Sequence, residues 1–142
     1  MNLNTDFVNK LRSSGLRPTK QRLKICEILF NTEKTFHFTI NDLSKIISEK
    51  LNEKISLATV YNTVHAFKNK GYLKEISINS DKSYFDTNTS VHHHFFDEDT
   101  NELIDCNEND IDSINVKNNI TGKKINSVEV LIKVAIDNQN QN

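Results

Sequence analysis

The stretch SLATVYNTVHAFKNKG, residues 56–71, has the pattern of an amphipathic helix with a signal at each end. Ser56 is a favourable N-cap because its hydroxyl accepts a hydrogen bond from a free backbone N–H of the first turn. Gly71 is a favourable stop because a helix often ends at a residue with positive φ. Between them one apolar stripe repeats at helical spacing: Leu57, Val60, Val64 and Phe67. We therefore expect a helix that buries this stripe.

The opposite side of this expected helix is small, polar and almost free of carboxylates: Ala58, Asn62, His65 and Asn69. Such a face suits the major groove of DNA, because Asn pairs with adenine and a small Ala contacts a thymine methyl group. Tyr61 lies at its margin, within reach of a base or a phosphate. From this segment alone, an ordinary amphipathic surface helix fits equally well.

The surrounding segments favour the DNA-binding interpretation. Helical patterns over residues 5–14, 20–31 and 40–51 precede the stretch, and Thr19 and Thr39 are suited to cap the last two. A linker is expected over residues 35–38. Two strand-like runs, residues 73–77 and 83–87, follow the stretch and flank a polar turn. Three helices, a recognition helix and a hairpin predict a winged helix-turn-helix over residues 1–87.

The remainder of the chain predicts a second, β-rich domain. We expect a hinge at residues 88–91 and a small domain over residues 92–142 that mixes strands with a crossover, so that the whole chain is α+β. Its expected strands are 92–97, 102–106 and 125–136, with a short helix or an irregular crossover over 107–124. Leu131 and Ala135 make the second face of the last strand partly apolar, which suits a sheet covered by another subunit.

Charge divides the 142-residue chain into two halves. Residues 1–85 carry 14 Lys and Arg against 8 Asp and Glu, whereas residues 86–142 carry 4 against 11. A basic half suits a polyanion, and an acidic half suits a cation or a partner subunit. The sequence contains neither an apolar run long enough to span a bilayer nor a signal-peptide pattern at its start, so we expect a cytoplasmic protein that does not bind membranes.

Cysteine usage excludes one kind of metal site. Cys26 and Cys106 are the only cysteines, and neither belongs to a CxxC pair. Two thiols cannot build a structural four-cysteine zinc site. A disulfide between them is not expected in the cytosol. Cys26 falls on the apolar stripe of a helix and is expected to be a small buried hydrophobe.

Three consecutive histidines, His92, His93 and His94, follow the expected hinge. On a strand, His92 and His94 share one face and His93 points to the other. Imidazole is a ligand for borderline transition metals and for haem iron. Asp86 before the cluster and Asp105 on the following strand are available carboxylates. The alternative is a set of solvated or hydrogen-bonded side chains.

Five segments place the chain beside a known family: GLRPTKQRLKICEILF, TFHFT, ISLATVYNTVHAF, KSYFDTNTS and HHHFF. They follow in the order seen in the ferric uptake regulator superfamily, which the chain resembles over residues 5–105. The segments TVYNTVHAF and FDTNTS with HHHFF are most similar to its haem-responsive branch, the iron response regulators. The resemblance implies a dimeric transcription factor in which Tyr61 contacts a base and Arg17 reaches toward the minor groove.

The same resemblance implies a ligand site. The family's inter-domain metal site falls on His37, Asp86, His94 and Asp105, while Phe96 occupies one usual ligand position. At a second regulatory site His93 remains, but Phe95 replaces an aspartate. In the haem-responsive branch the histidine triplet His92–His94 is implicated in haem binding. Some members also carry a Cys-Pro haem motif, which is missing here because Glu27 follows Cys26.

These observations lead to one prediction: a homodimeric regulator of iron and haem homeostasis that binds a palindromic, AT-rich operator and is released from it by haem. The residues expected at the DNA are Arg17, Lys20, Ser56, Ala58, Thr59, Tyr61, Asn62 and His65. A repressor of the same fold that is activated by Fe, Mn or Zn at the hinge is a first alternative. A haem or metal carrier that does not bind DNA is a second. An enzyme is not expected, because the sequence shows no nucleophile–base pair and no phosphate-binding loop.

Overall fold

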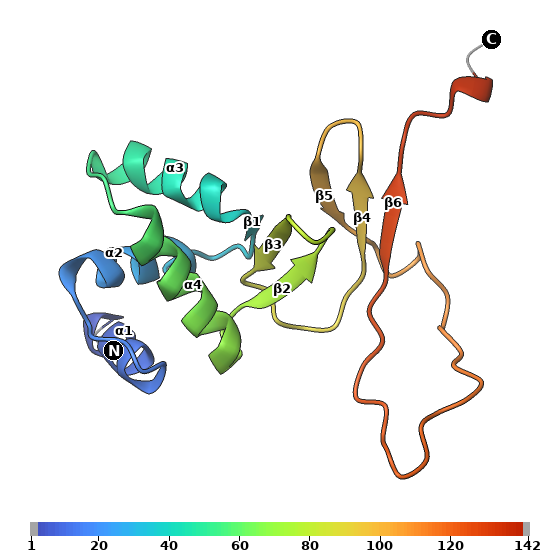
Figure 1. Cartoon of the computed structure of the whole chain (residues 1–142), viewed down its shortest axis with the longest axis horizontal. Helices are drawn as coiled ribbons and strands as arrows, with labels where there is room; N and C mark the ends of the chain where they lie inside the picture. The colour runs from blue at the N-terminus through green and yellow to red at the C-terminus, as the bar shows by residue number, and fades with distance from the viewer. Residues whose placement is uncertain (1–2, 141–142) are drawn as a thin grey trace. The chain divides into compact units, whose positions relative to one another are not determined.

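Four helices form most of the first half of the chain in the computed structural model, which describes residues 3–140 (Figure 1). They are α1 (Leu3–Ser13), α2 (Lys20–Phe30), α3 (Ile40–Leu51) and α4 (Leu57–Lys70). Helix α4 contacts both α2 and α3. The second half contains short strands, a long irregular segment and a short 3₁₀ helix, η1 (Asn138–Asn140). The expected α+β class, with a helical DNA-binding domain before a small sheet-containing domain, is confirmed.

Polar side chains begin the helices at the expected positions. The side chains of Thr19, Thr39 and Ser56 each accept a hydrogen bond from a backbone N–H in the first turn of α2, α3 and α4. At α3 the bond is reciprocal, because Asp42 accepts from the backbone N–H of Thr39 at 3.0 Å. Helix α4 ends at Gly71, whose φ of 87° is favourable for glycine and strained for other residues.

The core of the helical half is built from the predicted apolar stripes. Its fully buried members come from all four helices and include Leu11, Ile25, Cys26, Leu29, Leu43, Ile47, Val60, Val64 and Phe67. The expectation that Leu57 joins this core is wrong, because 53% of its surface is exposed. Leu57 is the first residue of α4 and lies on the same side as Val64, two turns later. Its exposure shows that the core does not extend over the start of the helix.

A three-stranded antiparallel sheet follows the helices. It contains β1 (His37–Phe38), β2 (Lys74–Ser77) and β3 (Ser83–Asp86) in the order β1-β3-β2. The expected hairpin is β2–β3, with register Ser77 opposite Ser83. Strand β1 lies in the segment that was expected to be a linker. Two residues are too few to show an alternating pattern, so only pairing with β3 defines this strand.

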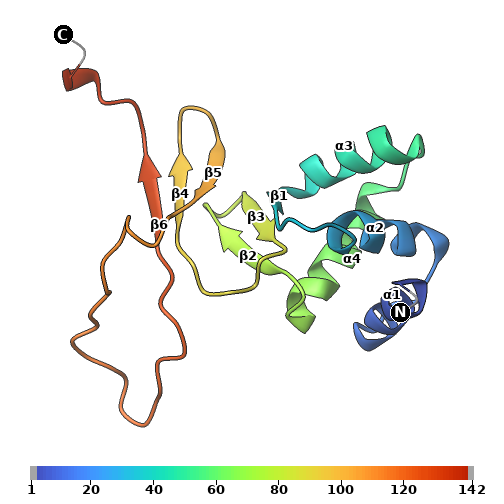
Figure 2. The same cartoon turned by 180° about the vertical axis from the view of Figure 1, so that it is seen from behind.

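The second half contains another three-stranded sheet, with β4 (His94–Asp97), β5 (Glu102–Asp105) and β6 (Leu131–Val134) in the order β5-β4-β6. Strands β4 and β5 are antiparallel, whereas β6 is parallel to β4. A parallel return requires a long connection. Residues 106–130 form it as an irregular crossover without helix, drawn in orange as a long loop in Figure 2.

The expected strand over 125–136 is therefore wrong in extent, because only Leu131–Val134 pairs with a neighbour. The alternation of apolar residues continues on both sides, but strand β4 offers only four partners. The chain divides into two compact units, Met1–Thr89 and Ser90–Asn142, which are described separately below. None of the helices described is both long and apolar enough to cross a bilayer.

Candidate nucleic-acid interface and metal centre

Helix α4 presents an exposed polar side, as the sequence predicts. Ala58, Tyr61 and Asn62 are exposed, and the exposed fraction of Tyr61 reaches 51%. The first turn contains no acidic residue, and Lys68 and Lys70 lie in the last turn. A face with amide, phenol and methyl groups and without carboxylates can enter a groove of DNA without electrostatic repulsion.

Two of the residues predicted at the DNA already have hydrogen-bond partners within the helix. The Ser56 hydroxyl donates to Thr59 Oγ1 at 2.8 Å and accepts from the Thr59 backbone N–H at 3.1 Å. Thr59 in turn accepts, at its carbonyl, a 2.7 Å hydrogen bond from the Thr63 hydroxyl. These contacts order the first turn of α4, so Ser56 and Thr59 define where the helix begins.

The predicted basic residues before and at the start of α2 are accessible. Arg17 and Lys20 are both exposed. The backbone carbonyl of Arg17 accepts a 3.2 Å hydrogen bond from the Arg22 guanidinium, which ties the loop to the helix. Positive side chains at the start of a helix are unfavourable unless an anion lies nearby. A DNA phosphate would supply that anion.

One contact of α4 has no counterpart in the expectations from sequence. The ring of His65 lies 4.1 Å from that of Tyr61 and 5.3 Å from that of Phe85, measured between centroids. His65 is partly buried, whereas Phe85 on β3 is 2% exposed. The spacing of Tyr61 and His65 along the helix allows the first contact, but nothing in the sequence brings Phe85 to the same place.

The first sheet brings together two predicted metal ligands. His37 of β1 is directly opposite Asp86 of β3, and Lys74 of β2 is opposite Asp86 on the other side. Directly opposite residues share a face of the sheet, so these three side chains form one row. Asp86 is 1% exposed, and its Oδ1 accepts the Asn88 N–H at 2.9 Å. Burial lowers the pKa of Lys74, and the negative charge of Asp86 partly offsets this shift.

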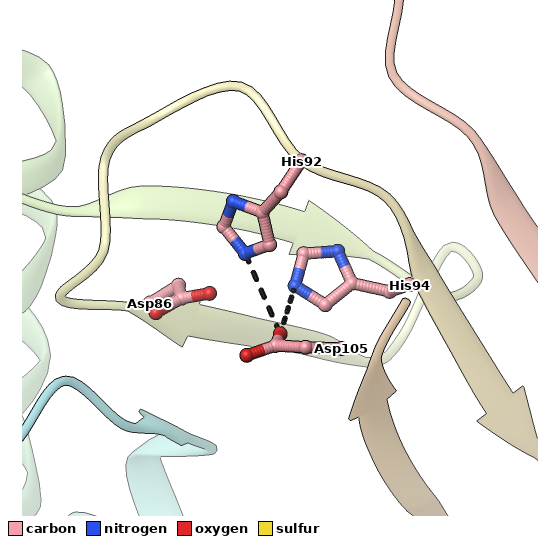
Figure 3. A group of neighbouring side chains, drawn as sticks. All are labelled: Asp86, His92, His94 and Asp105. Carbon is pink, nitrogen blue, oxygen red and sulfur yellow. Dashed lines mark ion pairs between the residues drawn. The ribbon is translucent and has the colours of Figure 1, made fainter. Parts of the chain in front are cut away.

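The second unit brings together three other predicted ligands, His92, His94 and Asp105. His94 is opposite Asp105 across β4 and β5, and its Nε2 lies 3.1 Å from Asp105 Oδ1. His92 Nε2 lies 3.4 Å from the same oxygen, and the two imidazole centroids are 4.4 Å apart (Figure 3). One ligand atom from each of the three residues falls within 4.8 Å of the others. Asp86, also drawn in Figure 3, belongs to the first unit.

The hydrogen bond of His92 prepares its ring to bind a metal. Its Nδ1 lies 2.8 Å from the Ser90 carbonyl oxygen. A carbonyl only accepts, so Nδ1 carries a proton, and in the neutral ring Nε2, which faces Asp105, is then the nitrogen that offers a lone pair to a metal. Histidine ligands in proteins are commonly oriented by such a bond from the other ring nitrogen. His92, His94 and Asp105 therefore offer two imidazole nitrogens and a carboxylate, a donor set that suits Fe, Mn or Zn.

His93 has the opposite ring chemistry. Its Nδ1 accepts a 2.9 Å hydrogen bond from the Val130 backbone N–H at the start of β6. The neutral ring must then carry its proton on Nε2, which leaves no free lone pair for an iron atom. The carbonyl of His93 also accepts from the Cys106 N–H at 2.9 Å. His93 thus connects β4 to the residues around it, and these bonds argue against a haem-ligating role.

The two cysteines lie in different environments, and neither belongs to the histidine cluster. Cys26 is fully buried in the helical core, and burial raises its pKa to about 12. Cys106 is partly exposed. Burial, together with the charges of Asp110 and Asp105, raises its pKa as well. A thiol with a raised pKa is a poor metal ligand and a poor nucleophile at neutral pH.

Comparison with known proteins gives concordant results. A model of the ferric uptake regulator family matches residues 13–134. The peroxide-responsive repressor PerR of Staphylococcus epidermidis is 32% identical over 109 residues, 77% of this chain and 71% of that protein. The peroxide operon regulator of Bacillus subtilis is 32% identical over 121 residues, 84% and 81% of the two chains. The Pseudomonas aeruginosa ferric uptake regulator, solved with manganese, superposes with a TM-score of 0.64 at 22% identity, covering 96% of this chain and 98% of that one.

Proposed function

This chain belongs to the ferric uptake regulator family, and on that premise we propose that it is a transcriptional repressor whose DNA binding is strengthened by a divalent metal ion. Members of the family are transcription regulators rather than enzymes. The observation that carries the proposal is the convergence of His92, His94 and Asp105. Such a regulator acts in the cytoplasm, where bacterial DNA lies.

The donor atoms of the proposed metal site already lie close together in the second unit. His92 Nε2, His94 Nε2 and a carboxylate oxygen of Asp105 supply three donors. His37 and Asp86, which the sequence also predicts as ligands, are paired with each other in the first sheet. A bound ion would supply positive charge that holds the Asp105 carboxylate and the two imidazoles in one arrangement. It strengthens DNA binding only if it prefers the DNA-competent arrangement.

Manganese or ferrous iron is the proposed activating ion. Nitrogen and carboxylate donors without thiolate suit these ions, whereas thiolate ligands favour zinc and cuprous copper. The relatives reported above are named for peroxide response, and one solved structure is named for manganese. These names, together with the hydrogen bond that occupies His93 Nδ1, favour a metal ion over haem. The haem-responsive branch, with haem opposing DNA binding, is the weaker hypothesis.

The proposed repressor is a homodimer. In the described part of the second unit the buried side chains are His94, Phe96 and Leu103, which is too small a core for independent stability. Phe95, Ile104 and Ile132 lie in one row across the second sheet, and 42% of Ile104 is exposed. A second copy of the chain would cover this apolar row. A dimer presents two recognition helices, which matches a palindromic operator.

The test is DNA binding by the purified metal-free protein, using DNA fragments selected from a random library. Mn(II), Fe(II), Zn(II) and haemin are titrated in parallel, and the haem absorption band is recorded. Tighter DNA binding with Mn(II) or Fe(II) supports the proposal. Release of DNA by haemin with a shift of the haem band would instead support the haem hypothesis.

The relatives also motivate one further arm of this experiment. Fe(II) reduces hydrogen peroxide, whereas Zn(II) has no redox chemistry. If the protein responds to peroxide as the named relatives do, the Fe(II) form should release DNA on addition of peroxide and the Zn(II) form should not. Binding of no DNA in any state would remove the central proposal.

A further inference from the structure

The exposed ring of Tyr61 is held in place by a column of rings inside the first unit. Tyr61 and His65 are four residues apart on α4, and their centroids are 4.1 Å apart at an interplanar angle of 35°. His65 meets Phe85 edge to face, at 5.3 Å and 77°. Phe85 in turn stacks on Phe38 at 6.1 Å. The column therefore runs from the surface of the recognition helix to the buried sheet.

The two ends of the column differ sharply in exposure. Tyr61 is 51% exposed, whereas Phe85 and Phe38 are 2% and 1% exposed. A ring that is half exposed and unsupported samples several rotamers, and ordering it on binding costs free energy. A ring stacked on a fixed neighbour has lost that freedom before binding. Within the described column, His65 is the residue that contacts both the exposed ring of Tyr61 and the buried ring of Phe85.

We propose that His65 is a positioning residue of the DNA interface, which holds Tyr61 in its binding orientation by stacking between Tyr61 and Phe85. This inference rests on the proposed DNA-binding function and assigns His65 a role other than reading a base. The partial burial of the imidazole supports that role, because the ring lies between those of Tyr61 and Phe85.

Strand β3 gives the column a further connection. Phe85 faces the helices, and the next residue, Asp86, points to the other face, in the row with His37. One strand thus carries both the base of the ring column and a predicted metal ligand. A displacement of β3 would move Phe85, and the stacked His65 and Tyr61 would follow it.

The test compares operator binding by four proteins: wild type, His65→Ala, His65→Phe and the control Ser48→Ala, which changes an exposed residue of α3. His65→Ala should weaken binding about threefold to tenfold, the effect of losing one aromatic pair. His65→Phe should restore it, because a phenyl ring can stack without hydrogen bonding. Ser48→Ala should bind the operator as wild type does, because Ser48 lies outside both the column and the DNA-facing side of α4.

A double-mutant cycle separates positioning from direct contact. If His65 acts through Tyr61, His65→Ala should have no further effect on binding in a Tyr61→Ala protein. Independent effects of the two substitutions, or a His65→Phe protein as weak as His65→Ala, would overturn the inference. The unfolding midpoint of each variant shows whether the fold itself has changed.

A readout without DNA keeps this inference distinct from the proposed function. Stacking on His65 shifts the NMR signals of the Tyr61 ring, and His65→Ala should move them toward the values of a free tyrosine. If these signals are unchanged, the stack does not hold Tyr61 and the inference fails alone. If wild type binds no DNA in any metal state, the proposed function fails and this inference fails with it.

Discussion

Two adjacent histidines show how a single hydrogen bond decides what a residue can do. His92 donates from Nδ1 to the Ser90 carbonyl and points Nε2 toward Asp105, whereas His93 accepts the Val130 N–H at Nδ1. In their neutral forms the first ring can bind a metal through Nε2 and the second cannot. Sequence spacing assigns the two rings to opposite faces, but only their partners fix the tautomers.

Asp105 is the residue on which the proposed metal site most depends, because both histidine rings face its carboxylate. Asp105→Asn should lower Mn(II) affinity at least about tenfold, since loss of even an outer partner of a ligand has an effect of that size. Isothermal titration measures it. Glu102→Gln, on the same strand and exposed, is the matched control and should bind Mn(II) as wild type does. Equal affinity of both variants would exclude Asp105 as a ligand.

The two thiols should differ in reactivity. Only the thiolate reacts readily with a disulfide reagent, and Cys26 is fully buried with its pKa raised to about 12. In the folded protein at neutral pH we expect one slowly modified thiol, Cys106, and a second only after unfolding in denaturant. A folded Cys106→Ser protein should therefore show no reactive thiol. Rapid modification of that variant would show that Cys26 is accessible.

At the scale of elements, α3 and α4 begin with the same kind of N-cap but differ in what they bury and expose. Both have a hydroxyl N-cap, and α3 adds the reciprocal bond from Asp42. Helix α3 then buries Leu43 and Ile47, whereas α4 buries one side and exposes the residues proposed to contact DNA. The capping interactions at the start of α3 therefore stabilise the core against which the recognition helix packs.

Removing the cap of α3 should destabilise the protein without touching the core. Thr39→Ala should lower the free energy of unfolding by about 1 kcal/mol, because a first-turn N–H loses its acceptor. Ser48→Ala, at an exposed position within α3, is the control and should be neutral or slightly stabilising, since alanine has the higher helix propensity. Urea unfolding followed by circular dichroism compares them. A Thr39→Ala midpoint equal to that of wild type would show that the cap contributes little.

At the scale of the whole molecule, the two units differ in the size of their buried cores, and therefore in how stable each can be without a partner. The first contains a core drawn from four helices and a sheet. The second buries few side chains among the residues described and exposes Ile104, Val134 and other large apolar groups. An exposed apolar sheet face of this kind marks an interaction surface. Association of two copies is therefore expected to stabilise the second unit.

A charge placed in that apolar row should weaken the dimer. Ile104→Glu should raise the dimer dissociation constant at least about tenfold, because the carboxylate would be buried without a partner. Sedimentation over a range of protein concentrations measures this. Ile120→Glu, in the crossover and 73% exposed, is the matched control. If Ile120→Glu dissociates the dimer and Ile104→Glu does not, the interface lies on the crossover instead of the sheet.

The local signals in the sequence determined most of the helical half. The caps at Thr19, Thr39 and Ser56, the stop at Gly71 and the stripe Val60, Val64, Phe67 are all where the residue pattern predicts. Each depends on contacts within a few residues or on one helical period. The resemblance to known regulators supplied the family, which the comparisons confirm.

Contacts between distant residues were decided only by the tertiary structure. Strand β1 exists because β3 pairs with it, β6 extends only as far as β4 offers partners, and Leu57 is exposed because of where α4 begins. The tautomer of His93 depends on Val130, and the ring of His65 meets Phe85, 20 residues further along the chain. A periodic pattern states which residues share a face. It does not state which partner that face will meet, and both the proposed metal site and the support of Tyr61 depend on those partners.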